Sequence, residues 1–388
     1  MTKKPSYRFV GYTEPWERRK LGEISSRVKG NDGRMDLPTL TISAGQGWLD
    51  QRERFSGNIA GKEQKNYTLL RKGELSYNHG NSKLAKYGVV FQLNNYTEAL
   101  VPKVYHSFKM IDGRSGTFFE YLFATKIPDR ELGKLVSSGA RMDGLLNITY
   151  DDFMSIKLTF PKNNEEQTAI GSFFQDIDQL ISLQQRKLEV LKEQKKTYLK
   201  LLFPAKGQTK PALRFAGFED DWKEVKLGEY CDIATGKLDA NAMVTDGEYD
   251  FYTSGIQKYK IDVAAFEGPA ITIAGNGATV GYMHYADGKF NAYQRTYVLS
   301  NFLVDRSFIY SEIGRKLPSK IQQEARTGNI PYIVMDMLTK LDICLPSLPE
   351  QEAIGSFFQD LDKAIAKQEE KVNQLKESKQ TLLRKMFI

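Results

Sequence analysis

The sequence contains few cysteines and histidines, and no apolar segment long enough to cross a membrane. The two cysteines, Cys231 and Cys344, cannot build a disulfide framework and favour a reducing compartment, so we expect a cytoplasmic protein. The three histidines, His79, His106 and His284, are scattered and leave no zinc-ligand spacing. The first residues are polar and lack a signal-peptide core, and no run approaches the ~20 apolar residues of a membrane span. We therefore expect no metal site and no membrane partner.

Several catalytic motifs are also absent. The sequence has no Gly-x-x-x-x-Gly-Lys-Ser/Thr loop of P-loop ATPases, no Gly-x-Ser-x-Gly and no His-Glu-x-x-His. No two prolines are adjacent, which excludes the Asn-Pro-Pro-aromatic tetrad of adenine methyltransferases. Asp220, Asp221 and Lys223 could form a nuclease carboxylate–lysine pattern, but a second copy of this segment, around Trp16, does not keep it. Coincidence is the better interpretation, and we predict no catalytic residue in this chain.

The composition is that of an ordinary globular protein with a basic balance. The 388 residues are 41% hydrophobic and 27% charged, which is enough to bury a core in two or three domains. The formal net charge of +7 permits a polyanionic partner without requiring one.

An internal repeat is the most informative feature of the sequence. Residues 166–203 match residues 350–387 at 21 of 38 positions without a gap, which excludes a chance similarity. A second pair lies upstream: Arg8-Phe9, Trp16 and Leu21-Gly22-Glu23 match Arg214-Phe215, Trp222 and Leu227-Gly228-Glu229. Between these anchors the segments have little identity. Duplication followed by neutral drift is one interpretation. The uneven drift favours another, in which the matching segments share one task and each divergent segment has its own target.

The two matching segments are predicted to be long helices with a heptad pattern. Neither contains an internal proline, and apolar residues alternate at intervals of three and four over about five heptads. Each helix could pack only on its own domain, but the sustained pattern favours a helix pair. Gln184 and Gln368 occupy equivalent polar slots that would fix the register. The predicted seam comprises Phe174, Ile177, Ile181, Gln184, Leu188 and Leu191 in the first helix, and Phe358, Leu361, Ile365, Gln368, Val372 and Leu375 in the second.

A short linker predicts the direction of the second helix. The segment 204–211 is rich in proline and glycine, so the second divergent segment starts where the first helix ends. Its own helix can then run back antiparallel to the first. This predicts an α+β fold with two mixed α/β domains separated by two long antiparallel coiled-coil helices, related by a pseudo-twofold axis.

Both divergent segments combine short strands with a helix. Strands are expected at 37–43, 74–77 and 88–93 in the first, and at 249–252, 270–273 and 297–299 in the second. Helices are expected at 117–125 and 308–316. Gly275 and Gly277 do not form a dinucleotide-binding loop, because no helix is expected to follow them.

Loops in both segments are rich in amide, hydroxyl, basic and aromatic side chains. Such groups can bond base edges and phosphates, although each loop taken alone is typical of an ordinary turn. The candidate DNA-binding residues are Ser43, Gln46, Tyr77, Asn78, His79, Asn81, Lys83 and Arg141 in the first segment, and Ser254, Gln257, Lys258, Tyr259, Asn276, Thr279, Arg295, Arg326 and Asn329 in the second.

In the order of these motifs, the chain resembles the specificity subunit of type I restriction–modification systems. The doubled entry Arg-Phe…Trp…Leu-Gly-Glu and the doubled Pro…Glu-Gln…Ile…Phe…Asp starting at Pro161 and Pro346 are similar to that family. The segments 73–83 and 140–148 resemble one class of its recognition domains, and 275–281 resembles another. The resemblance covers nearly the whole chain, and its specificity lies in the order rather than in any one motif.

The resemblance implies two target recognition domains and two conserved spacer helices. The expected divisions are 1–163, 164–203, 204–212 (linker), 213–347 and 348–388. It implies a non-catalytic chain that reads a bipartite, asymmetric site on double-stranded DNA. Its implied partners are two modification subunits, which methylate adenine with S-adenosylmethionine, and restriction subunits, which use ATP and Mg for translocation and cleavage. The chain itself would hold no cofactor. A stand-alone enzyme and a coiled-coil adaptor that ignores DNA are the rival interpretations.

Overall fold

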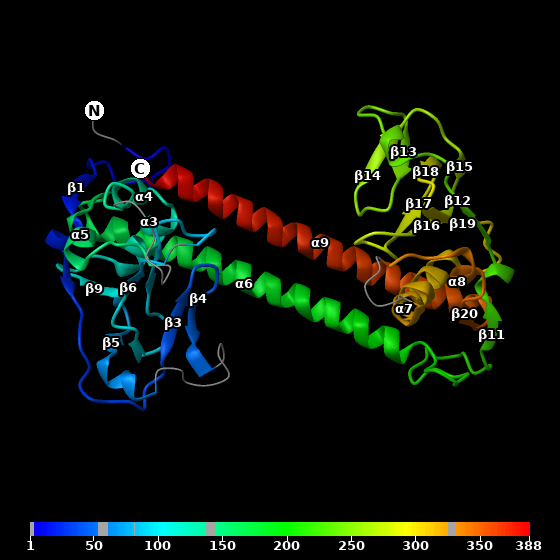
Figure 1. Cartoon of the computed structure of the whole chain (residues 1–388), viewed down its shortest axis with the longest axis horizontal. Coiled ribbons are helices and arrows are strands. Elements are labelled where there is room, and N and C mark those ends of the chain that lie inside the picture. Colours follow the sequence, from blue (N-terminus) through cyan, green and yellow to red (C-terminus); the bar gives the residue numbers. More distant parts are fainter. Residues whose placement is uncertain (1–3, 53–60, 81, 137–144, 325–330) are drawn as a thin grey trace. The chain divides into compact units, whose positions relative to one another are not determined.

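The computed structural model describes residues 4–52, 61–80, 82–136, 145–324 and 331–388 (Figure 1). Its contacts divide the chain into two compact units. Unit 1 comprises Met1–Gln184 and Lys371–Ile388, and unit 2 comprises Gln185–Glu370. Two long helices, α6 (Asn164–Leu201) and α9 (Leu348–Met386), therefore contribute one segment to each unit.

Unit 1 is built on a four-stranded antiparallel sheet in the order β2-β9-β6-β7, with further strand pairs β1-β10, β3-β4 and β5-β8 in its described part. The strands are β1 Glu17–Lys20, β2 Ser25–Arg27, β3 Leu40–Ser43, β4 Gly47–Asp50, β5 Thr68–Arg71, β6 Leu75–Asn78, β7 Val89–Gln92, β8 Glu98–Val101, β9 His106–Met110 and β10 Lys157–Phe160.

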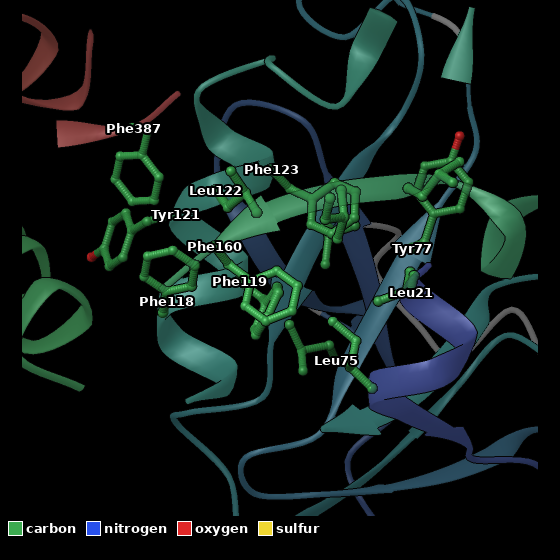
Figure 2. Close-up of a cluster of buried hydrophobic side chains, with 14 of the residues drawn as sticks. Leu21, Leu75, Tyr77, Phe118, Phe119, Tyr121, Leu122, Phe123, Phe160 and Phe387 are labelled. Carbon is green, nitrogen blue, oxygen red and sulfur yellow. The ribbon is translucent and has the colours of Figure 1, made fainter. Parts of the chain in front are cut away.

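Short helices cover this sheet and fill the core of unit 1. They are α1 Leu21–Ile24, the 3-10 helix η1 Gly61–Asn66, α3 Gly116–Ala124, α4 Asp129–Leu132 and α5 Tyr150–Ser155. Helix α5 starts at a capping box, in which Thr149 and Asp152 each bond the other's backbone N–H. Helix α3 supplies Phe118, Phe119 and Phe123 to the core (Figure 2).

The described residues of unit 2 form two four-stranded sheets, in the orders β12-β19-β16-β17 and β14-β13-β18-β15, and the pair β11-β20. The strands are β11 Lys223–Lys226, β12 Asp232–Thr235, β13 Tyr249–Tyr252, β14 Lys258–Ile261, β15 Phe266–Glu267, β16 Ala270–Ala274, β17 Met283–Ala286, β18 Lys289–Ala292, β19 Thr296–Ser300 and β20 Asp342–Leu345. The shorter helical elements are η2 Leu227–Glu229, η3 Ala240–Ala242, α7 Arg306–Glu324 and α8 Met335–Thr339.

The doubled entry motif forms the same ion pair in both units. In unit 1 the Arg8 guanidinium donates two hydrogen bonds to the Glu166 carboxylate, with N–O distances of 2.6 and 2.7 Å. In unit 2 Arg214 binds Glu350 in the same way, at 2.7 Å for both bonds. Both carboxylates are buried, and such a charge requires a paired partner. This requirement explains why the arginine and the glutamate recur together in the sequence.

The glutamine that follows each glutamate fastens the long helix to its unit. The Gln167 amide donates to the Pro161 carbonyl and accepts from the backbone N–H of Ser115, just before α3. Gln351 makes the equivalent bonds to Pro346 and Asp305, just before α7.

The repeated glycine permits a close helix contact. A Cβ atom on Gly171 would lie 3.0 Å from the Phe118 nitrogen, and one on Gly355 would lie 2.8 Å from the Phe308 nitrogen. We call the Arg–Glu ion pair, this glutamine and this glycine the frame of each unit.

In unit 1, the end of α9 packs beside the start of α6. The Phe387 ring lies 5.2 Å from that of Phe118 (Figure 2). It lies 5.8 Å from that of Phe174, and all three rings are buried. Asp178 lies one turn after Phe174, and its carboxylate accepts from Lys379 Nζ, two turns before Phe387, at 2.5 Å. The two helix segments are therefore antiparallel within unit 1.

Unit 2 repeats this arrangement with the helices exchanged. Here the end of α6 supplies Phe203, whose ring lies 5.3 Å from Phe308 and 5.9 Å from Phe358. Lys195 Nζ donates to Asp362 at 2.5 Å. The contacts of the repeat are thus conserved together with its sequence.

The predicted fold class is confirmed. Both units mix strands with helices, and both long helices form and pair antiparallel within each unit. The predicted strands and helices all occur, and most of their bounds shift by a few residues. The strand predicted at 37–43 begins at Leu40, and the helix predicted at 308–316 is longer, because α7 extends to Glu324. The predicted domain boundaries are a functional division and stay a prediction.

Candidate nucleic-acid interface

In unit 1, two candidate loops meet at the tip of the β3–β4 hairpin. Asn78, at the end of β6, donates from its amide to the Ile42 carbonyl on β3 at 3.2 Å. Gly45 at the hairpin tip packs against the exposed side chain of Leu84, which follows β6. Among the predicted residues on these loops, Gln46 and Lys83 are exposed and Ser43 is half-buried. These three side chains therefore lie on one loop surface and are available to a ligand.

Tyr77 and His79 were predicted to contact DNA, and the structure corrects both predictions. The Tyr77 side chain is 0% exposed, its ring stacks on Phe153 at 4.2 Å, and its hydroxyl donates to the Tyr87 carbonyl at 2.8 Å. His79 is 5% exposed. Strand β6 continues through Tyr77, so this polar sequence enters the core rather than forming an exposed loop. Asn78 is also occupied, because its amide oxygen accepts from the Gly80 N–H at 3.1 Å.

His79 links the two segments that resemble family motifs. Its ring nitrogens lie 2.8 Å from the Leu146 carbonyl and 3.0 Å from the Val104 carbonyl, and its own carbonyl accepts from the Leu146 N–H. The neighbouring His106 ring stacks on His79 at 4.8 Å, and burial lowers the pKa of His106. His79 therefore positions this loop surface from inside.

In unit 2, four segments converge on Asn276 in the turn after β16. The Ser254 hydroxyl donates to the Asn276 amide oxygen at 2.7 Å. Next to it, Gly275 donates its N–H to the Arg295 carbonyl at 2.8 Å, and the Gly275 carbonyl accepts from the Ile333 N–H at 2.7 Å. Asn276 also forms an antiparallel bridge with Tyr332. Loops that are distant in sequence are thus joined into one rigid surface.

The remaining candidates of unit 2 surround this node. The Thr279 hydroxyl donates to the Ser254 carbonyl, and the side chain of Arg295 is exposed. Gln257 and Lys258 are exposed on the β13–β14 hairpin, where Lys258 Nζ lies 5.2 Å from the Tyr252 ring centre. Tyr259 on β14 is half-buried. Four predicted residues lie outside the described part of the chain: Asn81, Arg141, Arg326 and Asn329.

Sequence reasoning missed three apolar members of the unit 2 surface. Ile256, Tyr282 and Tyr332 are 56%, 40% and 58% exposed, which is unusual for such side chains. The Tyr282 ring packs edge-to-face on His284 at 4.9 Å, and His284 in turn faces the Gly255 carbonyl at 3.4 Å. The proximity of Tyr282 to the Gly275–Gly281 turn was the available signal. Tyr332 had none, because only the fold brings it to Asn276.

The predicted seam residues line one face of each long helix. Phe174, Ile181, Gln368, Val372 and Phe358 are buried. The other predicted seam residues are half-buried: Ile177, Gln184, Leu188, Leu191, Leu361, Ile365 and Leu375.

Other kinds of site find little support in the described residues. They hold no cluster of three His, Cys, Asp or Glu side chains that could bind a metal, and none of their helices is long and apolar enough to span a membrane. Both cysteines are buried and free, and burial raises the pKa of Cys231 to about 12. These thiols are therefore protonated at neutral pH and poorly nucleophilic.

Comparison with known proteins identifies a class. Residues 219–377 match a family model described as the type I restriction modification DNA specificity domain. A 164-residue segment, 42% of the chain, is 40% identical to the specificity subunit of the type I restriction enzyme EcoDI of Escherichia coli. A segment of 292 residues, 64% of the chain, is 24% identical to the MjaVIII specificity subunit of Methanocaldococcus jannaschii. These matches cover 36% and 65% of the two relatives.

Solved structures agree on the fold. The structure of a type I restriction–modification S subunit from M. genitalium matches 100% of this chain and 99% of its own, with a TM-score of 0.68 and 16% identity. A chain from a structural study of complex assembly and conformational transition of a type I system matches 97% of this chain and 99% of its own, with a TM-score of 0.53 and 17% identity. The fold is therefore that of these S subunits, and the sequence matches, with residues 219–377 on the model of the DNA specificity domain, confirm the resemblance to type I specificity subunits.

Proposed function

We propose that the whole chain is the DNA sequence-specificity subunit of a type I restriction–modification complex. It reads a bipartite, asymmetric site on double-stranded DNA, with one half-site for each unit. One observation carries this proposal: an identical frame recurs in both units, while the loop surfaces mounted on the two frames differ. A protein that reads two different sequences in one complex needs this combination of a constant support and variable readers.

The two loop surfaces have the chemistry that DNA recognition requires. The unit 1 surface presents Gln46 and Lys83, and the unit 2 surface presents Asn276, Arg295 and Lys258. Amides and guanidinium groups bond base edges, and lysines bind phosphates. The formal net charge of +7 is of the sign that a polyanionic partner requires.

In this proposal the chain directs chemistry that its partners perform. Two modification subunits would methylate adenine with S-adenosylmethionine, and restriction subunits would cleave DNA with ATP and Mg. The complex would work in the cytoplasm, and this chain would be neither an enzyme nor a cofactor carrier. Residues 1–163 and 213–347 would be the two target recognition domains, and the long helices would hold the modification subunits.

A segment exchange with methylation mapping tests this function. Residues 213–340 are replaced by the matching segment of a relative, and the chimera is expressed with the modification subunits. We expect one half-site of the methylated motif to change, while the other half-site and the unread gap persist. The parental chain serves as the control. A continuous or palindromic parental motif, or a chimera in which both halves change, contradicts the proposal.

A further inference from the structure

The Asn276 side chain is oriented by the protein before any ligand arrives. Its amide oxygen accepts the Ser254 hydroxyl at 2.7 Å, and Thr279 fixes Ser254 by donating to its carbonyl. The Asn276 backbone is held by its bridge to Tyr332. The residue is half-buried, so part of the amide still faces solvent. In this orientation the amide oxygen is bonded to Ser254, and the amide nitrogen is the group left to face outward.

The outward group is a hydrogen-bond donor. With the oxygen bonded to Ser254, the Asn276 NH2 group remains, and within the described part of the chain it has no hydrogen-bond partner. Arg295 is joined to the same turn through its backbone and presents an exposed guanidinium, which has only N–H donors. Lys258 on the neighbouring hairpin likewise only donates. The amide, guanidinium and ammonium groups around Asn276 thus all offer donors to a ligand.

This pattern selects among the bases. An asparagine reads adenine through two bonds, and one of them requires the amide oxygen to accept from the adenine amino group. Ser254 occupies that oxygen. In the major groove, guanine presents two adjacent acceptors, O6 and N7, and no donor, whereas cytosine presents a donor. Two neighbouring donors therefore fit guanine, because thymine presents a single acceptor and adenine and cytosine each present a donor.

We infer that Asn276 is a specificity determinant of the second half-site and that it reads guanine as a donor, with Ser254 as its positioning residue. This inference rests on the proposed function and adds to it the identity of one base and the residue that reads it.

The test uses the full chain assembled with its modification subunits and maps the methylated motif in vivo. In N276A, one guanine of the second half-site should lose about tenfold or more of its preference over other bases, because one good contact gives discrimination of that order. S254A should lower the preference for guanine at the same position by a few-fold. S254T keeps the hydroxyl and should restore the parental preference. N276D replaces the donor by an acceptor and should favour cytosine at that position.

Controls separate this inference from folding and from the function itself. N241A removes an exposed amide on η3, outside the Asn276 surface, and should leave the motif unchanged. The first half-site, read in the same experiment, reports whether each variant is folded and assembled. An unchanged second half-site in N276A, an adenine at the affected position, or an S254A motif identical to the parental one overturns the inference while the proposed function stands. Failure of the parental complex to methylate a bipartite motif overturns the proposed function instead.

Discussion

In unit 1, the ion pair between Lys379 and Asp178 lies beside Glu120 on α3, whereas in unit 2 the equivalent pair lies beside Tyr310 on α7. Glu120 and Tyr310 are equivalent positions, because each lies two residues after the phenylalanine whose backbone nitrogen faces the frame glycine. One unit therefore holds an additional half-buried carboxyl at a place where the other holds a half-buried phenol. The lysine–aspartate pair that joins the long helices is the same in both units, whereas the residue beside it, Glu120 or Tyr310, differs between them.

The sheets differ more than the helices do. Among the residues that the structure describes, unit 1 carries its loops on one four-stranded sheet and smaller strand pairs, whereas unit 2 carries them on two four-stranded sheets. In both units the first and last strands pair with each other, as β1 with β10 and β11 with β20. The difference shows that the frame and the closing strand pair constrain the chain, while the strands between them can be rebuilt to present new loops.

The largest expected effect tests whether the two helix ends are equivalent. Phe387→Ala removes a buried ring from the core of unit 1, and Phe203→Ala removes its counterpart from unit 2. Each substitution should lower the free energy of unfolding of its own unit by about 3–5 kcal/mol, through lost burial and the cavity left behind. Hydrogen exchange resolved by segment measures both.

In the F387A variant we expect faster exchange in α3 and β10, with unit 2 unaffected. The reciprocal pattern is expected for F203A. Equal loosening of both units by either substitution would show that the helix ends do not act locally.

The second prediction concerns pH and separates the two units. Burial, with a contribution from the Asp178 charge, raises the pKa of Glu120 from 4.5 to about 7. Below pH 4.5 the carboxyl is protonated in the folded and unfolded states, so burial of the neutral group carries no ionisation penalty. Between pH 4.5 and 7 the folded state binds the proton more tightly, and stability falls as the pH rises. Above pH 7 the folded state carries the full cost of ionising Glu120, roughly 3 kcal/mol in the free energy of unfolding.

E120Q removes this titration and should therefore stabilise unit 1 at pH 8 but have little effect at pH 4.5. Denaturant unfolding at the two pH values measures the difference. The matched variant is Y310F in unit 2, because burial raises the pKa of Tyr310 and keeps the phenol neutral throughout this range. If E120Q raised the free energy of unfolding equally at both pH values, the gain would not come from the raised pKa of Glu120.

The smallest expected effect compares two buried hydroxyls that fasten the loop surfaces. Tyr77 donates to the Tyr87 carbonyl in unit 1, and Tyr297 donates to the Ile333 carbonyl in unit 2, both at 2.8 Å. Y77F and Y297F should each cost about 1 kcal/mol, because each leaves one carbonyl without its donor. Thermal unfolding measures the loss. No loss in Y297F would mean that the segment around Ile333 is held by its backbone bond to Gly275 alone.

The helices could be predicted from the sequence because their pattern is local. Heptad spacing places Phe174 and Ile181 on one face whatever the rest of the chain does, and both are buried in the structure. The ion pair of Arg8 with Glu166 could be suspected only from its recurrence, because the two residues are 158 positions apart.

The candidate site was less accessible to sequence reasoning because long-range contacts decide which polar residues are exposed. The segment Tyr77–His79 is as polar as an exposed loop, but His79 finds its partner 67 residues away, at Leu146. In unit 2 the prediction located the turn at Asn276 and its neighbour Ser254. Nothing local indicates that Tyr332 joins them, or that the Ser254 hydroxyl would choose the Asn276 oxygen.

The exchange of helix ends has a consequence for the order of events during synthesis on the ribosome. The core of unit 1 contains Phe118 and Phe160 together with Phe387, which is translated more than two hundred residues after Phe160. At a synthesis rate of about 5–20 residues per second, the nascent unit 1 waits for roughly 10–45 s with this part of its core open. Unit 2 obtains Phe203 before its own strands are made, so it can close first. The N-terminal residues thus belong to the unit that finishes folding last.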